Sequence, residues 1–303
     1  HTLQDSEMKR FFSFLFFMFL AVCILTEPTA CIGYAKNALL LWFLKILPTL
    51  FPFMVISGII IRMNLTSYFP SASAYGILVG FFCGFPMGAL TACTMYEEKQ
   101  ITQKEAEYLC AFTNNMGPVY FCSYVLPTLG ITNKLPYLIA MYGIPLLYGL
   151  VLRKTTYKSC AFQKLPSGSP VSLLNAIDAS ITQAITSITR LGGYLILLQT
   201  LYILPELLIR LLGRFPFVFR LPLPFLNAFL CCLLEITGGI SKMNTYPPLW
   251  VLVLLPLGGL SFILQAGSIL KNAGLSIPVY LLHKLIQTVL IFAFYVVIIH
   301  AGF

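Results

Sequence analysis

Two short stretches decide what kind of protein this sequence makes: CGFPMGA, from Cys83 to Ala89, and AFTNNMGP, from Ala111 to Pro118. Both lie among long apolar runs, yet both contain Gly and Pro, the residues that most often interrupt helices. The second stretch also carries two adjacent Asn side chains, which need hydrogen-bond partners wherever they are buried. The question is which surroundings make such interruptions stable.

The composition places the chain in a membrane. Hydrophobic residues make up 58% of the 303 residues and charged residues only 10%, and the mean hydropathy is +0.87. The apolar runs approach the ~20 residues that a helix needs to cross a bilayer. The sequence therefore predicts an all-α polytopic membrane protein, with the lipid bilayer as its surroundings.

Eight apolar segments are expected to enter the membrane, some of them as broken helices. They are Phe11 to Ile32, Leu39 to Ile61, Ser73 to Tyr96, Leu135 to Leu152, Leu191 to Ile209, Leu223 to Ile240, Leu249 to Leu270 and Val279 to Ile299.

The formal net charge of +9 does not indicate nucleic-acid binding, because Lys and Arg are dispersed in short loops beside apolar runs. Two basic clusters are expected in the cytoplasm: Lys9 with Arg10, and the loop residues Arg153, Lys154, Lys158 and Lys164. Both clusters can lie in the cytoplasm only if the chain between them crosses the membrane an even number of times. This holds if Ser73 to Tyr96 enters and leaves the membrane on the same side. Three later basic residues leave the topology of the second half open: Arg210, Arg214 and Arg220.

The N-terminal run from Met8 to Cys31 resembles a signal peptide in outline, but it has no A-x-A site, and Pro28 disrupts a lipobox before Cys31. An uncleaved first span is the prediction, with Met8 as a candidate start. The nine Cys show no metal-ligand spacing, so neither a metal nor another cofactor is expected. No Ser-His-Asp order and no phosphate loop is present, so an enzyme is not expected.

Four landmarks recur in the same order in two halves of the chain, which predicts two structural repeats. NA at Asn37 is matched by NA at Asn175, CGFPMGA by LEITGGI from Leu234 to Ile240, NNMGPVYF by GGLSFILQ from Gly258 to Gln265, and LGITNKLPY by AGLSIPVY from Ala273 to Tyr280. The predicted organisation is an N-terminal tail and first span (1–35), repeat one (36–152), a basic cytoplasmic linker (153–170) and repeat two (171–303).

A Gly or Pro in the middle of a span frees backbone N–H and C=O groups that hydrocarbon cannot satisfy. Such breaks are tolerated where protein, water or a ligand meets those groups. The N-terminal ends of half-helices attract anions, and unwound carbonyl groups can hold Na⁺. A pair of breaks in each repeat therefore predicts one site at the membrane midplane, with ordinary packed kinks as the alternative.

Ionisable residues within the apolar runs are the next candidates. Glu235 directly precedes a predicted break and is the candidate for binding a coupling ion. Lys45, Arg190 and Lys284 could supply positive charge to an anionic ligand, or could lie at the membrane boundary with their ammonium or guanidinium groups in water. Between the first two breaks, Thr102 and Glu105 predict a capping box at the start of a short helix, with Glu105 exposed to water.

The motifs resemble those of the sporulation integral membrane proteins of the YlbJ (SpoVV) type, which carry a so-called gate or nucleoside-recognition domain. The resemblance rests on CGFPMGA, E-A-E-x-L-x-A-F-T-N-N-x-G-P from Glu105 to Pro118, NALLLWFLKILPTLFPF, LLEITGG and GGLSF, from about Met8 to the C-terminus. The family usually has Tyr where this chain has Phe85, and Ser where it has Met116.

The resemblance implies two repeats with interrupted helices, in an architecture related to the concentrative nucleoside transporters. It also implies a permease that moves dipicolinate, a small anionic metabolite, across the outer forespore membrane of an endospore-forming bacterium. Homo-oligomerisation stays open. The residues expected to bind substrate lie at the breaks, with one countercharge: Gly84, Pro86, Gly88, Asn114, Asn115, Gly117, Pro118, Thr237, Gly238, Gly239, Ser261, Gln265 and Arg190.

Two other functions remain open at the level of sequence. One is an H⁺- or Na⁺-coupled carrier of a nucleoside or another polar metabolite, with Glu235 as the coupling residue. The other is a sporulation membrane protein that organises partners and transports nothing.

Overall fold

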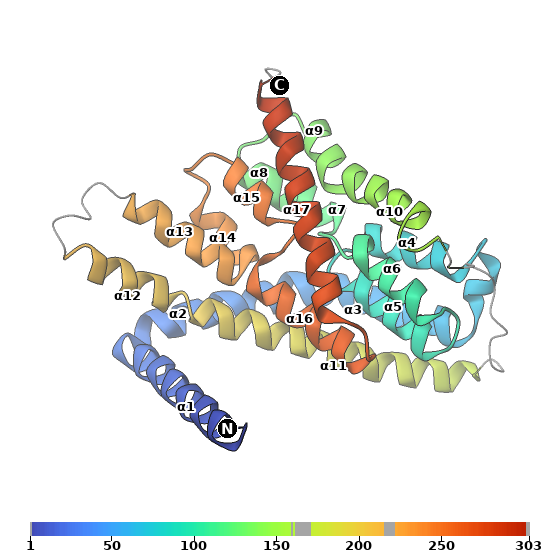
Figure 1. Cartoon of the computed structure of the whole chain (residues 1–303), viewed down its shortest axis with the longest axis horizontal. Coiled ribbons are helices and arrows are strands. Elements are labelled where there is room, and N and C mark those ends of the chain that lie inside the picture. The colour runs from blue at the N-terminus through green and yellow to red at the C-terminus, as the bar shows by residue number, and fades with distance from the viewer. Residues whose placement is uncertain (1, 159, 161–170, 215–221, 301–303) are drawn as a thin grey trace.

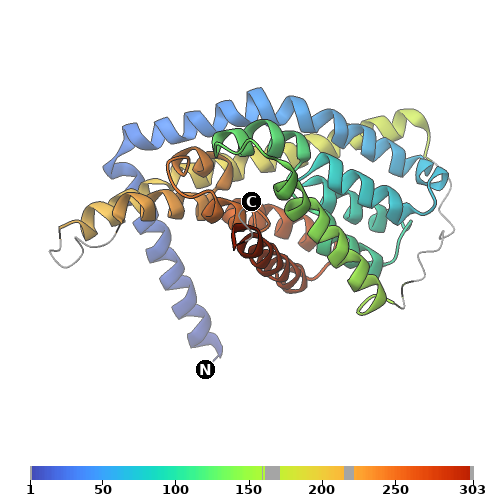
Figure 2. The same ribbon diagram turned by 90° about the horizontal axis from the view of Figure 1, so that it is seen from above.

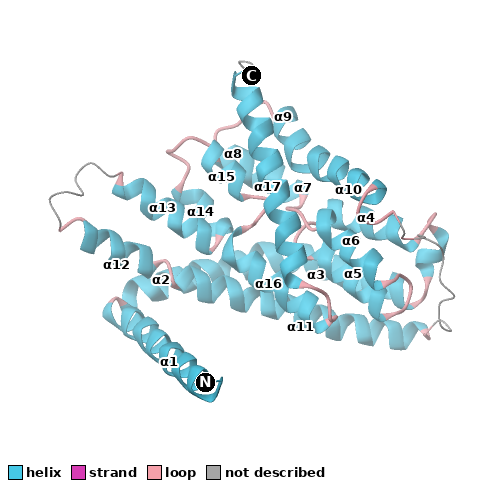
Figure 3. Ribbon diagram, in the orientation of Figure 1, coloured by secondary structure: helices cyan, strands magenta, loops and turns pink. Residues whose placement is uncertain are grey.

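The computed structural model describes residues 2–158, 160, 171–214 and 222–300. Every regular element within these ranges is a helix, and no strand occurs among them (Figure 3). Six candidate membrane spans in the described ranges, some of them built from consecutive helices, are long and apolar enough to cross a membrane: Glu7–Thr26, Pro28–Arg62, Leu135–Lys154, Leu173–Leu212, Leu249–Asn272 and Ile277–Ile298. The class predicted from composition, an all-α polytopic membrane protein, is confirmed.

The first two spans meet at a different place from the one predicted. Helix α1 (Thr2–Thr26) ends before Pro28, and α2 (Pro28–Leu41), the π-helical η1 (Trp42–Ile46) and α3 (Leu47–Arg62) then run on without a loop. The predicted boundary between Ile32 and Leu39 is therefore wrong. Proline lacks a backbone N–H and fits the first turn of a helix, so Pro28 begins the second span.

The long helix α11 (Leu173–Thr200) packs along α2 and α3 in the opposite direction and continues into α12 (Ile203–Leu212) (Figures 1 and 2). It begins well before the predicted Leu191, because α3 provides partners for its polar first half. Arg62 of α3 donates hydrogen bonds to Ser180 at 3.1 Å and to Gln183 at 3.0 Å.

Helices are interrupted at the two places marked by the first-half motifs. The segment predicted as Ser73 to Tyr96 is split at CGFPMGA into α4 (Ala72–Cys83) and α5 (Met87–Glu97), which pack against each other. Helix α6 (Gln103–Thr113) ends at TNNMGP, and the chain continues through α7 (Pro118–Tyr120), η3 (Phe121–Val125) and α8 (Leu126–Thr128).

Two interruptions also occur in the second half. Helix α13 (Leu223–Leu234) is followed by α14 (Ile236–Lys242) with only Glu235 between them. Four residues separate α15 (Leu249–Leu254) from α16 (Gly259–Asn272). The pairs α4–α5 and α13–α14 lie on opposite sides of α17 (Ile277–His300) in Figure 1.

The remaining elements complete the first half. Helices α9 (Leu135–Leu138) and α10 (Ile144–Lys154) are joined by η4 (Ile139–Gly143), and η2 (Leu65–Tyr68) precedes α4. Two predictions for the basic residues, Lys164 and Arg220, lie outside the described residues, as does most of the linker 153–170.

The predicted capping box at the start of α6 is confirmed. The backbone N–H of Glu105 donates to the Thr102 hydroxyl at 3.3 Å, and that of Thr102 donates to the Glu105 carboxylate at 2.8 Å. The expectation that Glu105 is exposed is wrong, since only 3% of its surface is accessible. Its carboxylate lies back against the helix start that it caps.

Candidate functional site

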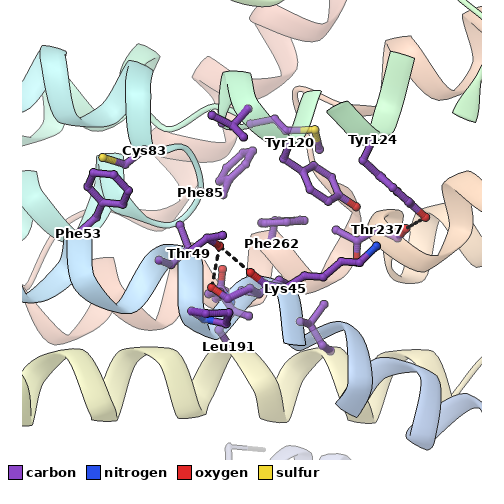
Figure 4. A pocket seen from close by; sticks show the side chains of 18 of the residues that line it. Lys45, Thr49, Phe53, Cys83, Phe85, Tyr120, Tyr124, Leu191, Thr237 and Phe262 are labelled. Carbon is purple, nitrogen blue, oxygen red and sulfur yellow. Dashed lines mark hydrogen bonds between the residues drawn. The ribbon is translucent and has the colours of Figure 1, made fainter. Parts of the chain in front are cut away.

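A cavity of about 680 Å³ lies where the helix interruptions approach α3 and α11 (Figure 4). Its wall includes residues at or beside each interruption: Cys83 and Phe85 from the first, Met116 and Gly117 from the second, Thr237 from the third, and Ser261, Phe262 and Gln265 after the fourth. The volume lies within the range of ~300–1,000 Å³ typical of small-molecule sites. Four separate interruptions therefore contribute to one cavity.

The wall is largely aromatic and aliphatic. The rings of Phe85 and Phe262 lie 4.6 Å apart between centroids, and those of Tyr120 and Tyr124 lie 5.0 Å apart. In Figure 4 these four rings lie above the Lys45 side chain, and the end of that side chain lies close to Tyr124. Such a wall suits a flat apolar body such as an aromatic ring.

Three polar atoms in this wall have no hydrogen-bond partner among the described residues. They are the hydroxyl oxygens of Tyr120 and Ser261 and the Oε1 oxygen of Gln265, each shielded from solvent. Ser261 is 3% exposed and Gln265 is 5% exposed. A buried polar atom without a partner costs about 1–3 kcal/mol, so these three atoms are positions where a ligand can supply the missing hydrogen bonds.

Lys45 contributes a positive charge at the same cavity. Its Nζ atom lies 5.5 Å from the centre of the Tyr124 ring. It forms no ion pair within the described residues. The amine is thus available to a negatively charged ligand.

Asn114 and Asn115 do not line the cavity. Asn114 donates from Nδ2 to the Tyr280 hydroxyl at 2.9 Å, and its Oδ1 accepts from the Ala89 N–H at 3.3 Å. Asn115 donates from Nδ2 to the carbonyl oxygen of Phe112 at 2.6 Å. Both amides are fully buried and join the second interruption to the first and to α17. In this structure they hold the wall together.

The carboxylate of Glu235 caps the short helix that follows it. It accepts hydrogen bonds from the N–H groups of Thr237 and Gly238, each at 2.8 Å, and from Gln199 Nε2 at 2.7 Å. The residue is fully buried. Its oxygen atoms are engaged by the chain itself, an arrangement that stabilises the third interruption.

The predicted glycines act mainly by allowing close packing. Gly84 has φ of +81°, and a Cβ atom there would lie 2.2 Å from the backbone nitrogen of Gly117. A Cβ atom on Gly88 would lie 2.7 Å from the Cα of Asn114, and one on Gly239 would lie 2.6 Å from the Cα of Cys232. Gly238 likewise faces the Gln199 side chain, with 2.7 Å between the added Cβ and Nε2.

Of the predicted substrate-binding residues, Gly117, Thr237, Ser261 and Gln265 reach the cavity wall. Gly84, Pro86, Gly88, Pro118, Gly238 and Gly239 shape the interruptions beside it. Arg190 is exposed on α11 and does not line the cavity. The two positions that depart from the family pattern, Phe85 and Met116, both line it.

Sequence reasoning missed the hydroxyl of Tyr120 and the surroundings of Lys284. Tyr120 lies within NNMGPVYF, three residues after Gly117. Its position one helical turn after a break could have indicated that its hydroxyl group lies at the site. The sequence left Lys284 either as a countercharge for an anionic ligand or as a residue at the membrane boundary, but it is only 1% exposed and does not line the cavity. No cluster of three or more His, Cys, Asp or Glu side chains suited to a metal ion occurs in the described part of the chain.

The chain is similar to the sporulation integral membrane protein YlbJ of Bacillus subtilis (strain 168), with 27% identity over 119 residues. That match covers 35% of this chain and 29% of the relative, so it spans less than a third of the curated protein. No family model matches the chain, and no solved structure matches it. Together with the membrane-spanning helices, the similarity supports a multi-pass membrane protein of sporulation.

Proposed function

We propose that this protein is a permease for a small anionic metabolite, most specifically dipicolinate, and that it acts in the outer forespore membrane of a sporulating cell. The observation that carries the proposal is the cavity, which combines an available Lys45 with three buried polar atoms that lack partners. Similarity to a sporulation membrane protein supports the cellular setting.

The chemistry of the cavity wall matches that of dipicolinate. This metabolite is a flat pyridine ring with two carboxylates, so it offers an apolar face and negatively charged edges. The rings of Phe85 and Phe262 suit the face, and the Lys45 amine suits one carboxylate. The Tyr120 and Ser261 hydroxyls can donate to carboxylate oxygens.

The arrangement of helices supports movement of a ligand through this site. Helix interruptions at membrane depth are tolerated where backbone groups are satisfied by protein or line a cavity. Here the wall is assembled from interruptions in both halves of the chain, which lie on opposite sides of α17 (Figure 1). A shift of one half against the other would open the cavity first to one side and then to the other.

The test is dipicolinate accumulation in spores of a host that lacks its own homologue. We expect the parent chain to restore accumulation, and a Ser261→Ala, Gln265→Leu double variant to restore less than a tenth of it at equal membrane abundance. The matched control is Ser268→Ala, on the same helix but outside the cavity wall.

Uptake assays with the purified protein in liposomes distinguish the dipicolinate permease from the nucleoside carrier and from an organiser of partners. Uptake of labelled dipicolinate by the parent supports the proposal. Uptake of a nucleoside in its place favours the nucleoside carrier. Restored spores without any uptake in liposomes favour the role as an organiser of partners.

A further inference from the structure

A second polar cluster lies behind the cavity wall, where α17 crosses the C-terminal end of α6. The Lys284 amine donates hydrogen bonds to the backbone oxygen of Asn114, to Oδ1 of Asn115 at 3.0 Å and to Oε1 of Gln287 at 3.4 Å. Lys284 is 1% exposed and Gln287 is fully buried. Three oxygen atoms thus converge on one buried ammonium group.

The described residues include no ion pair to Lys284. A buried ammonium without a counterion is costly unless its surroundings supply equivalent stabilisation. The oxygen atoms around it must therefore provide that stabilisation.

Those oxygen atoms are available because α6 ends at Thr113, inside the fold, where Thr113 and Asn114 are fully buried. The interruption at TNNMGP leaves carbonyl groups of the last turn without intrahelical partners, and the C-terminal end of a helix carries partial negative charge. Gln287 donates to one of these carbonyl groups, that of Ala111, and Lys284 donates to that of Asn114. Unwound backbone carbonyl groups and helix C-terminal ends of this kind also coordinate Na⁺ in other membrane proteins.

Aromatic rings close the rest of the site. The Lys284 amine lies 5.3 Å from the centre of the Phe85 ring and 5.9 Å from that of Tyr280. Phe85 also lines the cavity, whereas Lys284 does not. The Phe85 ring therefore neighbours both the Lys284 amine and the cavity.

We propose that Asn114, Asn115 and Gln287 form a monovalent-cation site that the Lys284 amine occupies in the folded protein. The chain carries its own cation at the second interruption, so Na⁺ does not bind there. Removing the amine while keeping the oxygen atoms opens the site to Na⁺. This inference concerns ion binding to the folded protein and is independent of which metabolite the cavity takes.

The experiment compares apparent Tm values of purified protein in detergent, in NaCl against choline chloride at equal ionic strength. The parent should melt at the same temperature in both salts. Lys284→Ala should melt lower in choline chloride and gain about 2–4 °C in NaCl, since an ion that binds only the folded state stabilises it. Lys271→Ala, an exposed lysine at the end of α16, is the matched control and should respond to neither salt.

Lys284→Met separates two effects of Lys284→Ala: the loss of the lysine amine and the opening of a site for Na⁺. Methionine fills the space of the lysine stem with no donor, so this variant should melt lower and show no response to Na⁺. A Na⁺-dependent rise in the parent would overturn the proposal, as would a folded Lys284→Ala that does not respond. If folded Lys284→Ala can be purified in NaCl but not in choline chloride, the result supports the proposal. If it can be purified in neither salt, the proposal is overturned, because Na⁺ then cannot replace the amine.

Discussion

The interruptions after α6 and after α13 solve the same problem with opposite charges. The first exposes helix C-terminal carbonyl groups, and the cationic Lys284 and the Gln287 amide donate to them. The second exposes helix N-terminal N–H groups, and the Glu235 carboxylate accepts from them. In each case the sign of the side chain complements the end of the helix dipole that it meets.

The difference lies in how each cap reaches its helix. Glu235 caps the helix that begins at the next residue, so its contact is local in the sequence. Lys284 reaches α6 across 170 positions of sequence. A cap next to its helix can be predicted from the sequence, whereas a cap from a distant residue can be found only in the folded structure.

The largest loss of stability is expected for Glu235→Ala. The substitution leaves two backbone N–H groups and the Gln199 amide without their acceptor, which should lower the free energy of unfolding by about 3–5 kcal/mol. Glu235→Gln keeps one oxygen acceptor and should lose less. Thermal melting in detergent measures both.

The control is Glu107→Ala, whose carboxylate accepts a hydrogen bond from the exposed Gln103 at 3.1 Å. Its melting temperature should stay within experimental error of the parent. Equal losses in Glu235→Ala and Glu107→Ala would show that the cap does not hold the third interruption.

Gly→Ala substitutions at the interruptions should destabilise the protein more in the first half of the chain than in the second. Gly84→Ala places Cβ 2.2 Å from the Gly117 nitrogen at a positive φ and should cost about 2–5 kcal/mol. Gly259→Ala places it 2.9 Å from the Cys232 oxygen at φ of +74° and should cost about 2 kcal/mol. The melting temperatures of the two variants show which substitution causes the larger loss of stability.

Gly193→Ala is the matched control, because the position is helical and no atom lies within 4 Å of the added Cβ. It should raise stability by about 0.5–1 kcal/mol through helix propensity. A smaller loss for Gly84→Ala than for Gly259→Ala would contradict the packing in the first half.

The two ends of α6 provide a smaller test. Thr102→Ala removes the capping box at the start of the helix and should cost about 1 kcal/mol. The loss should be the same in NaCl and in choline chloride, because this cap is far from the oxygen atoms that meet Lys284. Gln103→Ala, at the neighbouring exposed position, is the control; a salt-dependent loss in Thr102→Ala would contradict the separation of the two ends.

The smallest effect on stability is expected at the cavity. Tyr120→Phe removes a hydroxyl that has no partner, so the melting temperature should not fall, while dipicolinate uptake by liposomes should decrease. Tyr142→Phe is the contrast, since it removes a hydrogen bond to the Met116 carbonyl oxygen at 2.9 Å and should cost about 1 kcal/mol. A clear destabilisation by Tyr120→Phe would mean that its hydroxyl has a structural partner.

Much of the fold followed from local sequence. Apolar runs predicted the membrane helices, and Gly, Pro and Asn in CGFPMGA and TNNMGP marked where helices stop, because backbone conformation responds to these residues over one or two turns. The polar start of α11 was missed for the opposite reason. Its Ser and Gln side chains are satisfied by Arg62 of α3, a partner that hydropathy along one segment does not reveal.

The sequence by itself determined the class of the protein, the positions of the four interruptions and the cap at Thr102, since each depends on neighbouring residues. Only the tertiary structure decided which polar groups face the cavity and which are engaged. Asn114, Asn115 and Glu235 looked available in the sequence but are bonded within the fold. In contrast, the Tyr120 and Ser261 hydroxyls and the Gln265 Oε1 oxygen have no hydrogen-bond partner among the described residues. The physical reason is that a buried polar group is satisfied or left open by atoms that are distant in the chain.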